Sequence, residues 1–225
     1  MTPTRFPRGV LFDLDGTLLD SAPDMLATVN RMRATRGFGP MALADLRPHV
    51  SRGARAMSAA AFPGLGVEVD AALVREFLDV YAQELGRHSA PFDDIEAMLS
   101  ALEADGARWG IVTNKPEYLA REIVPQLRWH DRCAVLVGGD TLAERKPHPL
   151  PLLHAAGALG IAPRDCVYVG DDERDIRAAR AAGMPSIAAL WGYRLHDDVP
   201  ETWQADAIVE LPRDLLDPAR WPTPL

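Results

Sequence analysis

Residues 10–18 read Val-Leu-Phe-Asp-Leu-Asp-Gly-Thr-Leu, and this stretch is the most informative part of the chain. Its first three residues are apolar, as in a buried strand, and the acidic and glycine residues that follow indicate that the strand runs into a loop. Alternate residues of an extended chain point the same way, so Asp13 and Asp15 converge on one site. Two carboxylates this close repel each other unless a cation or a shared proton lies between them. Gly16 permits a tight turn back around the site.

Similar apolar runs recur along the chain and predict further strands at residues 110–112, 134–137, 166–169 and 187–190. Between them, helical patterns with one apolar face cover residues 119–127, 152–159 and 176–183. Strands that alternate with helices indicate an α/β fold with a Rossmann-like parallel sheet covered on both faces. Such sheets bind ligands at the carboxyl ends of their strands, which is where Asp13 and Asp15 fall.

Between the first strand and the rest of the α/β pattern, strand signals vanish over about 70 residues. Apolar or aromatic residues recur there at every fourth position from Leu73 to Leu85, which predicts a helix. We therefore predict an α/β core formed by residues 1–17 and 88–225, and a helical insert formed by residues 18–87. The proline-rich tail, Leu211 to Leu225, is expected to pack loosely on the surface.

The composition is that of an acidic globular chain. Its 225 residues carry a formal charge of −8, which argues against a general nucleic-acid binder, because such proteins present a basic face. No apolar run is long enough to span a bilayer, and residues 1–8 lack the apolar stretch of a secretory signal. Cys133 and Cys166 are expected to be buried free thiols in a reducing compartment. We therefore expect a cytoplasmic protein, monomeric by default, without a membrane or nucleic-acid partner.

The sequence resembles the haloacid dehalogenase superfamily, whose first motif, Asp-x-Asp-x-Thr, is present at residues 13–17. Three further motifs follow in the order of that family: Thr113-Asn114, Lys146-Pro147 and the Gly-Asp-x-x-x-Asp form at residues 170–175. The resemblance covers nearly the whole chain. It implies the fold of that family, in which the helical insert after the first strand is a mobile cap.

The resemblance also implies a phosphatase that works through an aspartyl-phosphate intermediate. Asp13 would attack phosphorus, and Asp15 would protonate the leaving alkoxide and later deprotonate the water that hydrolyses the acyl phosphate. The implied cofactor is Mg²⁺, held by the side chains of Asp13 and Asp171 and by the backbone carbonyl of Asp15. The residues implied to bind the phosphoryl group are Thr113, the backbone amide of Asn114, and Lys146. Gly16 supports this site through its tight turn.

Position 172 departs from a frequent family pattern, because many relatives carry Ser or Thr where this chain has Asp172. The metal role is therefore divided among three aspartates of the fourth motif. We expect Asp171 to be the direct ligand and Asp175 to act through water or by orienting Lys146. Lys115 follows the second motif, and we expect a surface or supporting role for it.

In the insert, Arg52 and Arg55 lie at a predicted helix start, where caps of this family lower a specificity loop onto the core site. Either arginine is a candidate to pair with an anionic part of the substrate, and the alternative is two ordinary surface arginines. The loop Trp191-Gly192-Tyr193 is typical of phosphoglycolate-phosphatase-like members, and we expect its aromatic rings to pack in the core. The histidines have no metal-ligand spacing and are expected to be structural: His49, His88, His130, His148, His154 and His196.

Three other functions fit parts of this pattern. A dehalogenase would lack the second aspartate of the first motif, so Asp15 counts against it. A β-phosphoglucomutase-like isomerase usually has Val or Ile at position 17, so Thr17 favours hydrolysis. A phosphate-sensing module would be shorter and would lack a cap.

Within the phosphatases, the sequence looks like the phosphoglycolate phosphatases. Residues 50–62 and 193–207 are also similar to bacterial N-acetylmuramic acid 6-phosphate phosphatases. The predicted substrate is a small phosphorylated metabolite, and the choice between these compounds and other sugar phosphates stays open because specificity lies in the cap.

Overall fold

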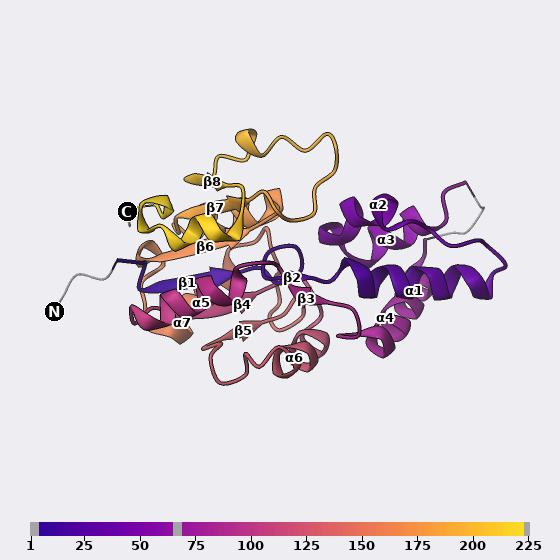
Figure 1. Ribbon diagram of the computed structural model, residues 1–225, viewed down its shortest axis with the longest axis horizontal. Coiled ribbons are helices and arrows are strands. Elements are labelled where there is room, and N and C mark those ends of the chain that lie inside the picture. The colour runs from indigo at the N-terminus through magenta and orange to yellow at the C-terminus, as the bar shows by residue number, and fades with distance from the viewer. Residues whose placement is uncertain (1–4, 65–68, 223–225) are drawn as a thin grey trace.

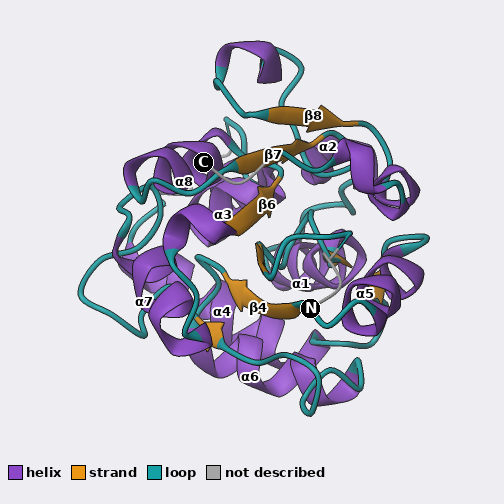
Figure 2. Cartoon of the chain, turned by 90° about the vertical axis from the view of Figure 1, so that its left-hand side faces the viewer, coloured by secondary structure: helices purple, strands orange, loops and turns teal. Residues whose placement is uncertain are grey.

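The structure, a computed structural model, describes residues 5–64 and 69–222. Its centre is a six-stranded sheet in the order β5-β4-β1-β6-β7-β8, and every neighbouring pair is parallel (Figures 1 and 2). The strands are β1 (Gly9–Phe12), β4 (Arg108–Val112), β5 (Leu136–Val137), β6 (Cys166–Gly170), β7 (Ser186–Ala189) and β8 (Ala207–Val209). The predicted parallel α/β fold is confirmed.

The central position of β1 explains its uninterrupted apolar sequence. All four of its residues are buried, and it pairs with β4 on one side and β6 on the other. Val10 and Phe12 belong to one apolar cluster and Leu11 to another, as the two-residue period of a strand requires. A strand covered on both faces needs apolar side chains at every position, so alternation with polar residues is lost.

Helices cover both faces of the sheet (Figure 2). On one face α5 (Ile95–Ala104) and α6 (Glu117–Gln126) contribute to the cluster that contains Phe12, and on the other α7 (Leu150–Leu159) and α8 (Glu173–Ala181) pack around Leu11. None of the helices within residues 5–64 and 69–222 combines the length and apolar character that a bilayer span requires. Cys166 is buried on β6 as expected, whereas Cys133 is only partly buried.

The strand predictions need three corrections. Within residues 134–137, only Leu136 and Val137 form a strand. The edge strand β8 was not predicted, because it is only three residues long and exposes Ile208, so it lacks the apolar run of a central strand. A two-stranded antiparallel ribbon of β2 (Leu19–Asp20) and β3 (Ala90–Pro91) was also not predicted, because its strands have two residues each.

The segment between β2 and β3 is helical in its described part, with α1 (Ala22–Thr35), α2 (Leu43–Leu46), α3 (Gly53–Ala61) and α4 (Ala71–Glu84). These helices lie beyond the end of the sheet toward which β1 runs (Figure 1). The ribbon brings the two connections between helices and sheet side by side, because Leu19 pairs with Pro91. The division into a core and a cap at residues 17/18 and 87/88 stays a prediction.

A buried carboxylate joins the first and last parts of the helical segment. Asp24 in α1 is fully buried and accepts the backbone N–H groups of Gly86 at 2.7 Å and His88 at 2.6 Å. The hydroxyl of Ser89 donates to the same carboxylate. These bonds fix the chain where it re-enters the core after α4.

The expectation of a loosely packed tail is wrong for its described residues. Leu215 is fully buried, and the short helix Pro212–Leu216 packs against α5. The indole N–H of Trp221 donates to the Leu215 carbonyl at 2.9 Å, and its ring meets Phe6 edge to face. Prolines in the tail start short 3₁₀ turns, and these turns aim the neighbouring apolar side chains at the core.

Candidate active site

The carboxyl end of β1 places Asp13 at the edge of the sheet. Its backbone N–H donates to the Val169 carbonyl of β6 at 2.9 Å, so the main chain still belongs to the sheet while the carboxylate lies beyond it. The chain then turns at Gly16 with a φ of +90°, and a Cβ there would lie 2.2 Å from Oδ2 of Asp171. Glycine is therefore required for the close approach of the first loop to the loop after β6.

Lys146 links the acidic residues of these two loops. The residue is 3% exposed, and its ammonium lies 3.0 Å from Asp13, 2.7 Å from Asp175 and 2.8 Å from the Tyr168 hydroxyl. These contacts match the three donors of the ammonium. Burial acts to lower the pKa of Lys146, but Asp13 and Asp175 outweigh it and raise that pKa. The side chain therefore stays charged although it is buried.

Three buried carboxylates form the acidic centre of the site. Asp13, Asp171 and Asp175 each offer an oxygen, and these oxygens lie within 4.8 Å of one another. Oδ2 of Asp171 accepts the Ser51 hydroxyl at 2.7 Å and the Tyr193 N–H at 2.8 Å. Burial, with the charges of Asp13 and Asp175, raises the pKa of Asp171 well above its usual value. Burial likewise raises the pKa of Asp175, to about 7.

The residues of this cluster fit a magnesium ion. Three carboxylates around one ammonium leave an excess of negative charge, which adds to burial, the main cause, in raising the pKa values of Asp171 and Asp175. Carboxylate oxygens are the ligands that Mg²⁺ prefers. Oδ1 of Asp175 is paired with Lys146 and its Oδ2 accepts the Asp172 N–H at 3.1 Å. Among the described residues, the contacts of Asp13 with the Leu14 N–H and with Lys146 are both at Oδ1, so its Oδ2 is the better donor for a metal.

Asp172 faces the start of α8 instead of the acidic centre. Its carboxylate accepts the backbone N–H of Arg174 at 2.9 Å and pairs with the guanidinium of the same residue at 2.7 Å. Burial acts to raise the pKa of Asp172, but the pairing with Arg174 outweighs it and lowers that pKa. The aspartate at this position is the N-cap of α8, a role that Ser or Thr can also fill.

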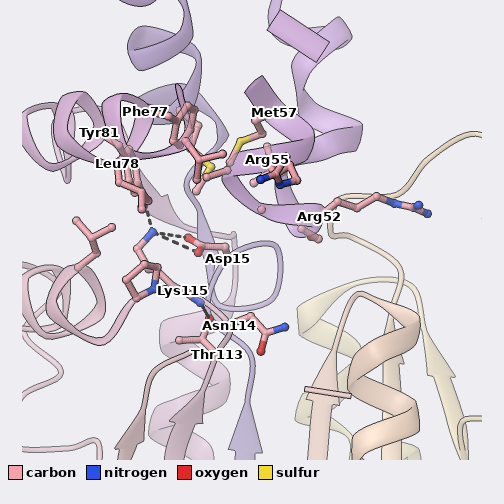
Figure 3. A pocket seen from close by; sticks show the side chains of 18 of the residues that line it. Asp15, Arg52, Arg55, Met57, Phe77, Leu78, Tyr81, Thr113, Asn114 and Lys115 are labelled. Carbon is pink, nitrogen blue, oxygen red and sulfur yellow. Dashed lines mark hydrogen bonds and ion pairs between the residues drawn. The ribbon is translucent and has the colours of Figure 1, made fainter. Parts of the chain in front are cut away.

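Asp15 points to the other side of the site, where it meets Lys115. The ammonium of Lys115 lies 3.1 Å and 3.2 Å from the two carboxylate oxygens of Asp15 (Figure 3). The same ammonium donates to the hydroxyl of Tyr81 on α4 at 2.6 Å. Lys115 is 7% exposed, so a surface role is wrong for this residue.

Thr113 and Asn114 follow β4 and lie beside Asp13 at the edge of the sheet. The Thr113 N–H donates to the Val137 carbonyl at 2.9 Å, which continues the β4–β5 ladder and fixes the buried hydroxyl side chain. The Asn114 side-chain amide donates to the Lys146 carbonyl at 3.0 Å. The second and third motifs are thus held together at the same end of the sheet.

A cavity of about 440 Å³ separates these groups from the helical segment. Asp13, Asp15 and the residues after β4 line its floor, and residues of α3 and α4 line its roof (Figure 3). Arg52 and Arg55 both line it, but Arg52 extends away from Asp15 and pairs with Asp198 at 2.7 Å. Arg55 is exposed and its guanidinium donates to the Val69 carbonyl, so both arginines lie at the rim of the cavity instead of at its floor.

A sequence model of the family described as haloacid dehalogenase-like hydrolase matches residues 10–189, which is most of the chain. The chain belongs to this family. The phosphoglycolate phosphatase of Xanthomonas campestris pv. campestris (strain 8004) is 66% identical over 220 residues, which cover 98% of this chain and 100% of that protein. The N-acetylmuramic acid 6-phosphate phosphatase of Pseudomonas aeruginosa is 45% identical over 214 residues and 93% of each chain.

A relative of known crystal structure has the same architecture. The crystal structure of a predicted phosphoglycolate phosphatase from Haemophilus somnus 129pt has a TM-score of 0.82 and 28% identity, and the match covers 95% of this chain and 97% of that one. Together with the family match, these likenesses confirm the predicted superfamily and a phosphatase activity. They do not favour the mutase, dehalogenase or phosphate-sensing alternatives.

Four contacts of this haloacid dehalogenase-like site were missed by the sequence interpretation. Ser51 reaches Asp171 from the helical segment, and the Arg174 guanidinium donates to the Ser51 carbonyl. The backbone of Tyr193 also holds Asp171, and Tyr81 holds Lys115. The Trp191-Gly192-Tyr193 loop, which we expected only to pack, thus shapes the site. Its position directly after a strand was the available signal, whereas nothing local marks Ser51.

Proposed function

We propose that this chain is a magnesium-dependent hydrolase of small phosphomonoesters that also carry a carboxylate, with Asp13 as the nucleophile. The observation that carries the proposal is that two aspartates from one strand end line the same cavity and pair with different lysines. Asp13 contacts the buried Lys146 at 3.0 Å, and Asp15 lies toward the cap. This arrangement supports Asp13 as the nucleophile and Asp15 as the acid on the side of the leaving group.

Two steps follow from these positions. An oxygen of Asp13 forms a bond to phosphorus while the bond from phosphorus to the leaving oxygen breaks, and the Asp15 carboxyl gives its proton to that oxygen. In the second step the Asp15 carboxylate takes a proton from water. The water oxygen attacks phosphorus, the bond to Asp13 breaks, and inorganic phosphate leaves.

The residues around Asp13 stabilise the charge of the transferred group. Lys146 is buried, positively charged and in contact with Asp13, so it balances the phosphoryl charge without the cost of reorganisation. The Thr113 hydroxyl and the Asn114 backbone N–H are the proposed donors to phosphoryl oxygens. Asp175 keeps Lys146 in position through the 2.7 Å contact.

Mg²⁺, when bound, would neutralise phosphoryl charge and hold an oxygen of the substrate beside the nucleophile. Asp13 and Asp171 are the proposed side-chain ligands, with the backbone carbonyl of Asp15 as a third protein ligand. The buried, hydrogen-bonded setting of Asp171 supports this assignment, because its carboxylate cannot swing away from the site.

The two named relatives suggest the class of substrate. Their substrates, 2-phosphoglycolate and N-acetylmuramic acid 6-phosphate, both carry a carboxylate in addition to the phosphate. Arg52 and Arg55 at the cavity rim are the proposed partners for this carboxylate. A cavity of about 440 Å³ lies within the range of sites that hold ligands much larger than glycolate, which supports a sugar acid as the larger candidate.

The proposal is tested by phosphate release in the presence of Mg²⁺. The panel holds 2-phosphoglycolate, N-acetylmuramic acid 6-phosphate, glucose 6-phosphate as an ester without a carboxylate, and a nucleotide. We expect turnover of a carboxylate-bearing ester that is abolished in Asp13→Asn and by a chelator. A folded wild-type protein that releases no phosphate from any ester with Mg²⁺ present would refute the proposal. A preference for glucose 6-phosphate would refute the part of the proposal that requires a carboxylate in the substrate.

A further inference from the structure

Lysine is rare in this chain, and both lysines lie in the active site. Of the 24 basic residues, 22 are arginines, and the two lysines are Lys115 and Lys146. Both are buried, with 7% and 3% exposure. Lys146 has a place in the family motifs and in the proposed reaction, whereas Lys115 has none. The ammonium of lysine is more compact than the planar guanidinium of the 22 arginines, and the space beside Asp15 holds it in a buried position.

The ammonium of Lys115 fills a gap between the core and the cap. On the core side it contacts both oxygens of Asp15, and on the cap side it donates to the hydroxyl of Tyr81 and lies 4.4 Å from the centre of its ring (Figure 3). Removing an ammonium from water costs free energy unless an opposite charge and hydrogen-bond acceptors replace the water. Asp15 supplies the opposite charge, and its oxygens and the Tyr81 hydroxyl are the acceptors.

Both partners of this contact are held in place by their own elements. The Lys115 N–H donates to the Thr113 hydroxyl oxygen at 3.2 Å, and its carbonyl accepts the Gly139 N–H at 2.8 Å. Tyr81 is 2% exposed and packs beside Phe77 on α4. The ammonium is therefore held in place by its own loop and by α4, and it can align the carboxylate of Asp15.

Asp15 is the carboxylate that needs such alignment. It follows the strand in a loop, and within residues 5–64 and 69–222 its side chain has hydrogen bonds to Lys115 only. A proton donor must lie within hydrogen-bonding reach of the leaving oxygen, and a misplacement of about 1 Å can cost about 10²-fold in rate.

We propose that Lys115 and Tyr81 are positioning residues that align Asp15 for proton transfer to the leaving group when the cap covers the site. This inference rests on the proposed function, in which Asp15 is the acid of the first step. The covalent chemistry is unchanged: the proton moves from Asp15 to the leaving oxygen, and the carboxylate that results is paired with the Lys115 ammonium. Tyr81 ties this alignment to the cap, because it is the cap residue that holds the ammonium.

The test compares two leaving groups. An alkoxide must be protonated as it leaves, whereas p-nitrophenolate is stable as an anion and needs no proton. We therefore measure kcat/KM, which reports the steps up to loss of the leaving group, for p-nitrophenyl phosphate and for the alkyl phosphate that the wild-type enzyme hydrolyses fastest. The variants are Lys115→Met and Tyr81→Phe. The control is Tyr118→Phe, because Tyr118 is half exposed on α6 and does not line the cavity.

We expect Lys115→Met to lower kcat/KM for the alkyl phosphate by about 10-fold to 10²-fold more than for p-nitrophenyl phosphate. Tyr81→Phe keeps the aromatic packing, and we expect a smaller loss with the same selectivity. Equal losses on both substrates, or no loss, would overturn the inference and leave the proposed function intact. Absence of wild-type turnover on every ester would overturn both. Tyr81→Phe keeps the test decisive if Lys115→Met fails to fold.

Discussion

The close approach of Gly16 to Asp171 gives the sharpest test of the site geometry. Gly16 has a φ of +90°, and a Cβ there would lie 2.2 Å from Oδ2, 2.7 Å from Cγ and 2.8 Å from Oδ1 of Asp171. The carboxylate cannot move aside freely, because Thr17, Ser51 and Tyr193 all donate to it. Gly16→Ala therefore forces either the first loop or Asp171 out of position.

The expected cost has two parts. A residue with a side chain in the left-handed region costs about 1–2 kcal/mol, and overpacking at a site that cannot relax costs about 1–3 kcal/mol. The sum of about 2–5 kcal/mol corresponds to a fall in Tm of roughly 4–20 °C for a chain of this size. A shift of about 1 Å in Asp171 is expected to lower kcat/KM by about 10²-fold, because it displaces the proposed metal ligand.

Gly37→Ala is the matched control. Gly37 also has a positive φ, +75°, but a Cβ there has nothing within 4 Å. It carries the backbone strain without the collision, so we expect a loss of about 1–2 kcal/mol and unchanged activity. Thermal unfolding and phosphate release are measured for both variants. If Gly16→Ala matches Gly37→Ala in both measurements, the close packing of the two loops is refuted.

Three further predictions follow from the buried charges and thiols. Lys146→Met leaves two buried carboxylates without their cation, so we expect a loss of about 3–5 kcal/mol in urea unfolding, and an unchanged midpoint would contradict the pairing. Mg²⁺ should raise the Tm of the wild-type protein but not of Asp171→Asn, and an equal rise in both would exclude that carboxylate as a ligand. Burial raises the pKa of Cys166 from 9.0 to about 11, so its neutral thiol stabilises the fold below pH 9 and this contribution is lost as the pH rises through 11. The free energy of unfolding falls by about 3 kcal/mol over this range. The prediction is contradicted if the free energy of unfolding changes equally with pH, from 9 to 11, in the wild-type protein and in Cys166→Ala.

Local patterns were sufficient to predict the fold class. The apolar run before Asp13 and its repetition at intervals along the chain predicted a buried parallel sheet, because a strand covered on both faces must be apolar throughout. The edge strand β8 and the ribbon β2–β3 were not predicted from the sequence, because short or half-exposed strands show little periodicity in their apolar residues. The tail was misjudged for a related reason, since its proline turns suggested a surface segment while Leu215 enters the core.

The motif residues could be predicted as a group, because each follows a strand and parallel strands end at one edge. Strand order and motif position are enough to bring Asp13, Thr113 and Asp171 to that edge. They do not give the orientation of each side chain. Lys115 is an example: the sequence allowed a surface lysine, and only the packing of α4 over the loop after β4 buries its ammonium against Asp15.

The sequence by itself determined the family, the parallel sheet and the edge at which the acidic residues gather, because these depend on periodicity and on motif order. The tertiary structure alone decided that the ammonium of Lys115 meets Asp15 and the hydroxyl of Tyr81. It also decided that Ser51 of the helical segment reaches Asp171, 120 residues along the chain. Such pairings depend on distances across elements, and no local pattern in a single sequence encodes those distances.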